Sequence, residues 1–150
     1  MMTIQALTEK DLESCAKVFL QTYNQAPWNY QWKIDDALKY LTEYYASAQF
    51  KGFLLYDDGV FAGAMFAHTK TWWTGAQFYI DELFIAPNAQ KKGYGKALMN
   101  FAERYALDQG LGTITLMTHK FMPSMKFYEG IDYVHAQPFV ILFKPTASCN

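Results

Sequence analysis

Apolar and polar residues recur along this chain with two different periods, which predict a mixture of strands and helices. Apolar residues at every second position predict strands, and apolar residues three or four apart predict helices. By these patterns, strands are expected at Thr3–Leu7, Phe53–Tyr56, Val60–His68, Gln77–Ile85 and Thr113–Met117. Helices are expected over Leu12–Tyr23, after Asp35 and Asp36, from Gly95 onward, and from Pro123 to Tyr128.

Turn and cap residues support this order of elements. Thr8-Glu9-Lys10-Asp11 is typical of a helix start, and Asp58-Gly59 is the strongest hairpin signal in the chain. A closing hairpin is expected from Val134–His135 and Phe139–Lys144, with Pro138 near its bend. Without repeats or linkers, the pattern predicts one α+β domain over residues 1–150.

Composition narrows the class of protein. Hydrophobic residues make up 51% of the chain and aromatic residues 18%, which excludes disorder and predicts an aromatic core or an aromatic-lined site. A net charge of -1 gives no basic field for nucleic acid, and no apolar run is long enough to span a membrane. Cys15 and Cys149 form neither a disulfide framework nor a metal-ligand pattern, and no export leader is recognisable, so a cytoplasmic protein without metal is expected.

The most informative segment is the turn between the Gln77–Ile85 strand and the following helix. Gly93 and Gly95 lie where the helix begins and its backbone N–H groups lack partners, so the turn is suited to bind a diphosphate. A Walker loop is excluded because Gln90 stands where it needs glycine and Ala97 where it needs Ser or Thr. A Rossmann fingerprint is excluded because Leu98 replaces its third glycine.

Gln90, Gly93 and Gly95 fit the pattern Gln/Arg-x-x-Gly-x-Gly/Ala, and in this the chain resembles the GNAT superfamily of acetyl-CoA-dependent N-acetyltransferases. The order of elements and the Phe127-Tyr128 ending of the last helix extend the resemblance over nearly the whole chain. The resemblance implies the GNAT fold, a mixed and mostly antiparallel sheet flanked by helices. It also implies acetyl-CoA as cosubstrate, bound by Leu83, Phe84, Ile85, Gln90, Lys91, Lys92, Gly93, Tyr94, Gly95 and Lys96.

Acetyl transfer to an amine needs a group that accepts the amine's proton, and Asp81 and Glu82 are the candidates. Adjacent strand residues point to opposite faces, so only one of them is expected to face the site. Asp81 ranks first, because the resemblance places a catalytic carboxylate there in several GNAT enzymes. Glu82 is the rival if a bulge shifts the alternation, and ordered waters are the third alternative.

Tyr128 is the candidate acid that protonates the departing thiolate, and the GNAT resemblance supports that role. Trp28 and Trp72 are candidates for an aromatic wall around the acceptor amine. Among the histidines, His119 alone is noted as a candidate, whereas His68 and His135 are interpreted as structural or exposed.

These features predict an N-acetyltransferase that acts on a small-molecule or peptide amine in a ternary complex. The alternatives are an acyl-CoA sensor or partner subunit with the same fold, and a nucleotide-binding domain of another kind. No nucleic-acid or membrane partner is expected. A homodimer stays open, since GNAT proteins are often dimers.

Overall fold

The structure is a computed structural model that describes residues 1–147. These residues form two compact units, Met1–Thr118 and a second unit that begins at His119. Cys149 lies outside the described residues. The interpretation of residues 1–150 as one domain therefore stays a prediction.

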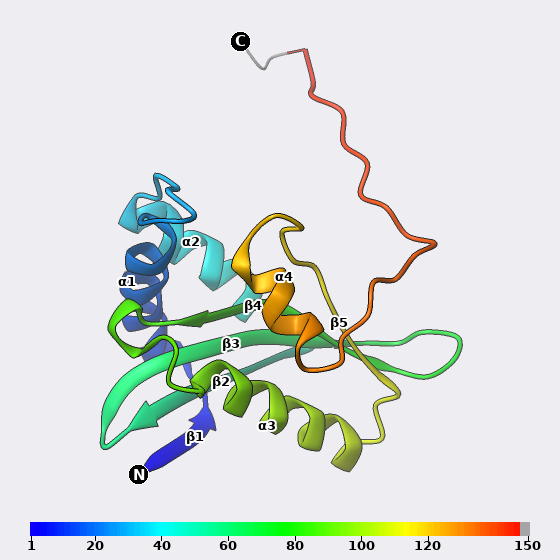
Figure 1. Cartoon of the computed structure of the whole chain (residues 1–150), viewed down its shortest axis with the longest axis horizontal. Coiled ribbons are helices and arrows are strands. Elements are labelled where there is room, and N and C mark those ends of the chain that lie inside the picture. Colours follow the sequence, from blue (N-terminus) through cyan, green and yellow to red (C-terminus); the bar gives the residue numbers. More distant parts are fainter. Residues whose placement is uncertain (148–150) are drawn as a thin grey trace. The chain divides into compact units, whose positions relative to one another are not determined.

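The first unit is built on a five-stranded sheet whose strands lie in chain order, β1-β2-β3-β4-β5 (Figure 1). The strands are β1 (Met2–Ala6), β2 (Phe50–Asp57), β3 (Val60–Lys70), β4 (Gln77–Ile85) and β5 (Thr113–Leu116). The pairs β1–β2, β2–β3 and β3–β4 are antiparallel, and β5 pairs with β4 in parallel. The predicted mixed, mostly antiparallel sheet is thereby confirmed. Asp58 and Gly59 form the predicted turn between β2 and β3, with φ of 48° and 80°, respectively.

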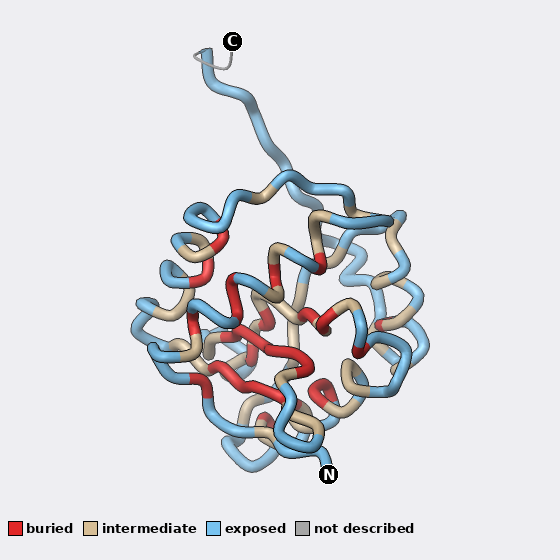
Figure 2. The backbone as a smooth tube through the Cα atoms, turned by 90° about the vertical axis from the view of Figure 1, so that its left-hand side faces the viewer, coloured by how far each residue is buried: buried red, intermediate tan, exposed pale blue. Residues whose placement is uncertain are grey.

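Helices cover both faces of this sheet (Figure 1). They are α1 (Leu12–Tyr23), α2 (Ile34–Tyr45) and α3 (Tyr94–Asp108), with short 3-10 turns at Glu9–Asp11 and Pro87–Ala89. On one face, Phe19 of α1 meets Phe84 of β4 at 5.5 Å between ring centroids. On the other, Tyr105 of α3 meets Phe78 of β4 at 5.4 Å. Figure 2 shows buried residues on the inner sides of the helices and along the strands.

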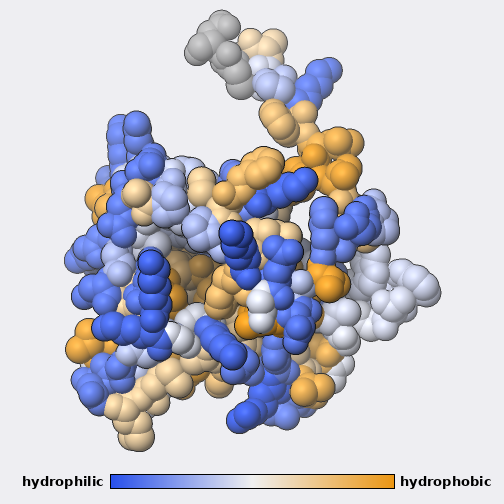
Figure 3. All heavy atoms as spheres, viewed as in Figure 1, coloured by the Kyte–Doolittle hydropathy of each residue, from blue (hydrophilic) through white to orange (hydrophobic). Residues whose placement is uncertain are grey.

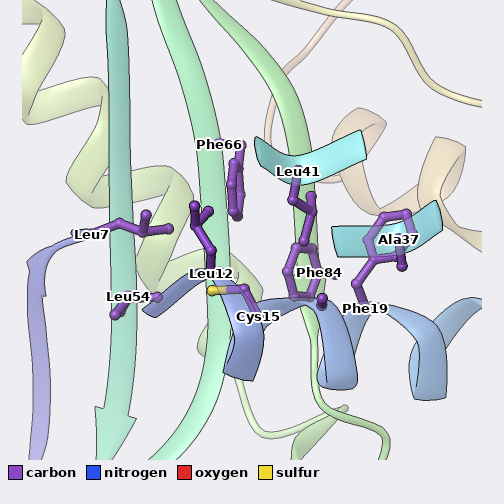
Figure 4. Close-up of a cluster of buried hydrophobic side chains, with 11 residues drawn as sticks. Leu7, Leu12, Cys15, Phe19, Ala37, Leu41, Leu54, Phe66 and Phe84 are labelled. Carbon is purple, nitrogen blue, oxygen red and sulfur yellow. The ribbon is translucent and has the colours of Figure 1, made fainter. Parts of the chain in front are cut away.

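The core between the sheet and α1 and α2 is rich in aromatic and branched side chains, as the composition predicted. Figure 4 shows Leu12, Cys15 and Phe19 of α1 with Leu41 of α2, facing Leu54, Phe66 and Phe84 of the sheet. All are nearly inaccessible to water. Burying such side chains stabilises the fold by about 1.5–3 kcal/mol each, so this core fixes α1 and α2 over one face of the sheet.

In the second unit, α4 spans Pro123–Glu129, which agrees with the predicted short helix. The predicted closing hairpin of Val134–His135 and Phe139–Lys144 is wrong, because none of these residues is in a strand. Residues 139–143 read Phe-Val-Ile-Leu-Phe and are 67–88% exposed, and Figure 3 shows hydrophobic side chains along this segment at the upper right. The composition favours a strand, but a strand forms only where another strand pairs with its backbone.

Candidate active site

Strand β4 has an open edge at its second half. Strand β5 pairs with Gln77–Ile80 and not with the residues that follow. The carbonyl of Leu83 accepts a hydrogen bond from the Tyr23 hydroxyl at 3.5 Å, and that of Ile85 accepts one from Thr22 Oγ1 at 3.2 Å. Because the N–H and C=O of one strand residue point the same way, the N–H groups of Leu83 and Ile85 also face this edge. The edge therefore offers strand donors to an extended ligand.

The turn that follows β4 leads directly into the start of α3. Gly93 is the N-cap residue, with φ 86°, and Lys91 also has a positive φ of 62°. The first backbone hydrogen bond of the helix joins the N–H of Ala97 to the carbonyl of Gly93, at 3.0 Å. The N–H groups before Ala97 therefore have no acceptor within the helix, and they form an anion-binding helix start.

Several side chains of the predicted cofactor site are already engaged by the protein itself. Gln90 Nε2 donates to the carbonyl of Ile85 at 3.1 Å, which ties the turn to the end of β4. The Tyr94 hydroxyl donates to Asp57 of β2. The ring of Phe84 is 2% exposed in the core. These three residues offer a ligand mainly their backbone, whereas Lys91, Lys92 and Lys96 have exposed side chains.

A β-bulge interrupts the ladder of β3 and β4 beside the two predicted carboxylates. Phe66 pairs with Glu82 and Ala67 with Ile80, so Asp81 is left without a partner. An extra residue on one strand changes the alternation of its side chains. Phe78 accordingly contacts α3, whereas Glu82, four residues on, contacts Tyr40 of α2 on the opposite face.

As a result, both carboxylates lie on the face that α1 and α2 cover. Burial raises the pKa of the Tyr44 hydroxyl of α2, and the charges of Asp81 and Glu82 add to that rise. The expectation that only one of the two would face this side is wrong, because the bulge turns Asp81 and Glu82 the same way.

Glu82 is held by tyrosines. The Tyr40 hydroxyl donates to Glu82 Oε1 at 2.6 Å, the Tyr23 hydroxyl approaches Oε2 at 3.4 Å, and Tyr44 lies 3.2 Å from the Tyr40 hydroxyl. Burial raises the pKa of Glu82 to about 7, although the two tyrosine hydrogen bonds favour its ionised form. We name Tyr23, Tyr40 and Tyr44 the tyrosine cluster. Sequence reasoning missed it, although Tyr40 and Tyr44 share one face of a helix by their spacing.

Asp81 is paired with a histidine. His68 Nδ1 of β3 lies 2.7 Å from Asp81 Oδ2, and the imidazole stacks on Tyr79 at 5.2 Å between ring centroids. Burial raises the pKa of Asp81, and the hydrogen bond and charge of His68 act in the opposite direction. Sequence reasoning treated His68 as structural. His68 pairs with Tyr79, two residues before Asp81, and this register is a property of the two strands that the sequence does not show.

The tryptophans proposed for the acceptor wall differ in their surroundings. Trp28, in the turn after α1, packs edge-on against Tyr23 at 5.2 Å and lies 5.9 Å from Tyr30 between ring centroids. Trp28 therefore extends the aromatic surface that includes the tyrosine cluster. Trp72, between β3 and β4, is 51% exposed.

Tyr128 lies in α4 of the second unit. Its ring packs edge-on against Phe127 at 5.0 Å and Tyr133 at 5.9 Å. The N–H of Tyr133 donates to the carbonyl of Tyr128 at 3.0 Å, and Asp132, after α4, has the left-handed conformation, with φ 71°. His119 belongs to the same unit and is exposed.

Residues 1–147 contain no group of three or more His, Cys, Asp or Glu residues placed to hold a metal ion. No helix in this part of the chain is long and apolar enough to cross a membrane.

Solved structures with the same fold are numerous. A transcriptional regulator from Bacillus halodurans has a TM-score of 0.77 at 17% identity, over 96% of this chain and 100% of that one. The aminoglycoside N-acetyltransferase AAC(6')-Iy in complex with CoA has a TM-score of 0.73 at 18% identity, over 98% and 95%. An aminoglycoside acetyltransferase from an uncultured soil metagenomic sample, in complex with sisomicin, has 0.72 at 18%, over 97% and 95%.

At such identities these structures show the fold alone. No protein of curated function matches the chain by sequence. The model of the acetyltransferase (GNAT) family matches residues 13–133, which include β4, its bulge, the glycine turn and α4. The chain therefore belongs to the acetyltransferase (GNAT) family and is an acyltransferase that uses acetyl-CoA.

Proposed function

We propose that this protein transfers the acetyl group of acetyl-CoA to a primary amine of a small molecule or peptide, by direct attack in a ternary complex. One observation carries the proposal. The carboxylates of Asp81 and Glu82 lie together on one face of β4, immediately after the last residue that pairs with β5. Negative charge beside an open strand edge suits a cationic amine that must meet a strand-bound thioester.

The open edge of β4 and the start of α3 support one position for acetyl-CoA. The diphosphate would lie on the N–H groups of Gly93–Lys96. There the positive N-terminal end of α3 and three lysines favour negative charge. The CoA arm would then run back along Leu83–Ile85 and bond to the strand N–H groups. A strand rises about 3.3 Å per residue, so the path from Ile85 back to Asp81 covers about 13 Å. This path brings the thioester end to the carboxylates.

The acceptor side combines charge with aromatic rings. The tyrosine cluster and Trp28 supply ring faces and edges near Glu82, and Trp72 is the second candidate for this wall. Aromatic faces and carboxylates together favour a ligand with several ammonium groups. The aminoglycoside-bound structure of the same fold is consistent with such an acceptor.

The chemistry requires a base for the amine and an acid for the thiolate. Asp81 assists removal of the ammonium proton, with Glu82 and a water chain as the alternatives. The Tyr128 hydroxyl protonates the CoA thiolate as it leaves, and the strand N–H groups at Leu83–Ile85 polarise the thioester carbonyl. An acyl-CoA sensor with the same fold would need neither the carboxylates nor Tyr128.

The test is an amine-panel assay that follows CoA thiol release by the wild-type protein. Aminoglycosides, polyamines, amino acids and peptides form the panel, with alcohols of similar size as controls. We expect release that depends on an amine. Binding of acetyl-CoA without release with any panel amine would favour the sensor.

Two further properties belong to the proposal. A homodimer is supported by the exposed apolar residues 139–143, since soluble monomers seldom leave such a run uncovered. Light scattering after size exclusion should give twice the mass of the chain. A cytoplasmic location is consistent with Cys15, a buried free thiol whose pKa burial raises to about 12.

A further inference from the structure

His68 and Asp81 form a pair at the bulge of β4 in which Asp81 is buried and His68 is partly exposed. The Asp81 side chain is 8% exposed and the His68 side chain 30%, so the imidazole is the member of the pair that water reaches more easily. Its Nδ1 is 2.7 Å from Asp81 Oδ2, and no other hydrogen bond involves the ring within residues 1–147. Stacking on Tyr79 fixes the ring plane. Nδ1 is therefore engaged by Asp81, and Nε2 makes no hydrogen bond within residues 1–147.

An ionised carboxylate can only accept, so a hydrogen bond to it places the imidazole proton on Nδ1. The lone pair of the neutral ring is then on Nε2, the nitrogen that faces away from Asp81. A carboxylate behind a histidine also stabilises the imidazolium that forms when Nε2 takes up a proton. A general base whose ring is oriented by a carboxylate has this geometry.

We propose, on the basis of the acetyl transfer proposed above, that His68 Nε2 is the catalytic base for the acceptor amine and that Asp81 is its positioning residue. Glu82 has a different task, because its oxygens face the hydroxyls of Tyr40 and Tyr23. It is placed to hold an ammonium group of the acceptor by charge. Tyr79, on which His68 stacks, and Tyr44 are further ionisable groups on this face.

The proton balance is complete with the two substrates, the side chains of His68 and Tyr128, and water. His68 Nε2 takes one proton from the ammonium group, and the neutral amine nitrogen attacks the thioester carbonyl carbon. A C–N bond forms, the C–S bond breaks, and the electron pair leaves on sulfur. As the tetrahedral adduct collapses, Tyr128 gives its proton to the thiolate and is reprotonated by the second proton that the nitrogen releases. The imidazolium returns the first proton to water.

The first experiment compares His68→Gln, Asp81→Asn and the double variant with wild type. His135→Gln is the control, because His135 is exposed and lies in the second unit. We expect His68→Gln to lower kcat/KM at neutral pH by about 10²-fold or more, with partial recovery at high pH as free amine accumulates. The thermal shift given by acetyl-CoA should stay at the wild-type value, which separates this loss from a failed cofactor site.

The double variant distinguishes a positioning role from a direct one. If Asp81 acts through His68, the double variant is no slower than His68→Gln alone, because residues that act as a unit are not additive. Full activity of His68→Gln, or additive losses in the double variant, would overturn the proposal while leaving acetyl transfer by the wild type intact.

A second measurement needs no acceptor. Nitrogen NMR of histidine-labelled protein, with the His68 signals identified by their loss in His68→Gln, reports which ring nitrogen carries the proton. We expect neutral His68 to be protonated on Nδ1 in wild type, with a changed proton distribution in Asp81→Asn. A neutral ring protonated on Nε2 in wild type would overturn the proposal, whatever the panel assay gives.

Discussion

Glu82 gives the sharpest prediction about stability. Its pKa is about 7 in the folded protein and 4.5 in the reference state, because burial disfavours the carboxylate. Between these values the folded state keeps a proton that the unfolded state has lost, so the free energy of unfolding falls as the pH rises. At about 1.4 kcal/mol for each pKa unit, the full cost is about 3 kcal/mol above pH 7 and vanishes below pH 4.5.

Glu82→Gln removes this titration and keeps an oxygen that can accept from Tyr40. The assay is urea unfolding of wild type and variant at several pH values, with Glu43→Gln on the exposed side of α2 as control. The stability of the variant relative to wild type should rise by about 2.5 kcal/mol between pH 5 and pH 8. The control should show no comparable rise. A difference that is constant over this range would refute the argument that Glu82 is destabilised as a buried carboxylate.

Two further predictions concern the cosubstrate and its leaving group. Gly93→Asp, at φ 86°, should reduce the thermal shift given by acetyl-CoA well below that of Gly110→Asp, which places the same side chain at a φ of 69° beyond the last residue of α3; equal shifts would mean that the diphosphate lies elsewhere. Tyr128→Phe should lower turnover by about 10²-fold and leave the melting temperature and acetyl-CoA binding nearly unchanged, since the ring packing on Phe127 and Tyr133 remains; near-normal turnover would remove Tyr128 from the mechanism.

Local patterns predicted most of the first unit because its elements are bounded by strong turn chemistry. Asp58-Gly59 fixed one hairpin, and Gly93 takes the left-handed conformation that the start of α3 requires. Helix α3 begins at Tyr94, one residue before the expected start. The helix start was therefore visible in the sequence.

The arrangement of the carboxylates of Asp81 and Glu82 was not visible in the sequence. Phe78 and Phe84 are six residues apart, and a regular strand would place them on one face, yet they pack against α3 and α1. The bulge that separates them depends on how β3 pairs with β4, which is a property of two strands. The same pairing brings His68 to Asp81, and packing of α2 brings Tyr40 to Glu82 over a separation of 42 residues.

The closing hairpin failed for a related reason. The run from Phe139 to Phe143 has the composition of a strand, but composition does not show whether a partner strand is available. Among residues 1–147 no strand pairs with it. A periodic pattern thus predicts which residues are able to form a strand, and the ladder decides whether they do.

The central claim is that the acetyl group passes from acetyl-CoA to an amine. Mass spectrometry of the wild-type reaction with isotope-labelled acetyl-CoA tests it directly, with an amine that releases CoA thiol in the panel assay. We expect one labelled acetyl group on the amine for each thiol released, and no labelled protein. Thiol release that yields free acetate in place of an acetylated amine, or label that accumulates on the protein, would contradict it.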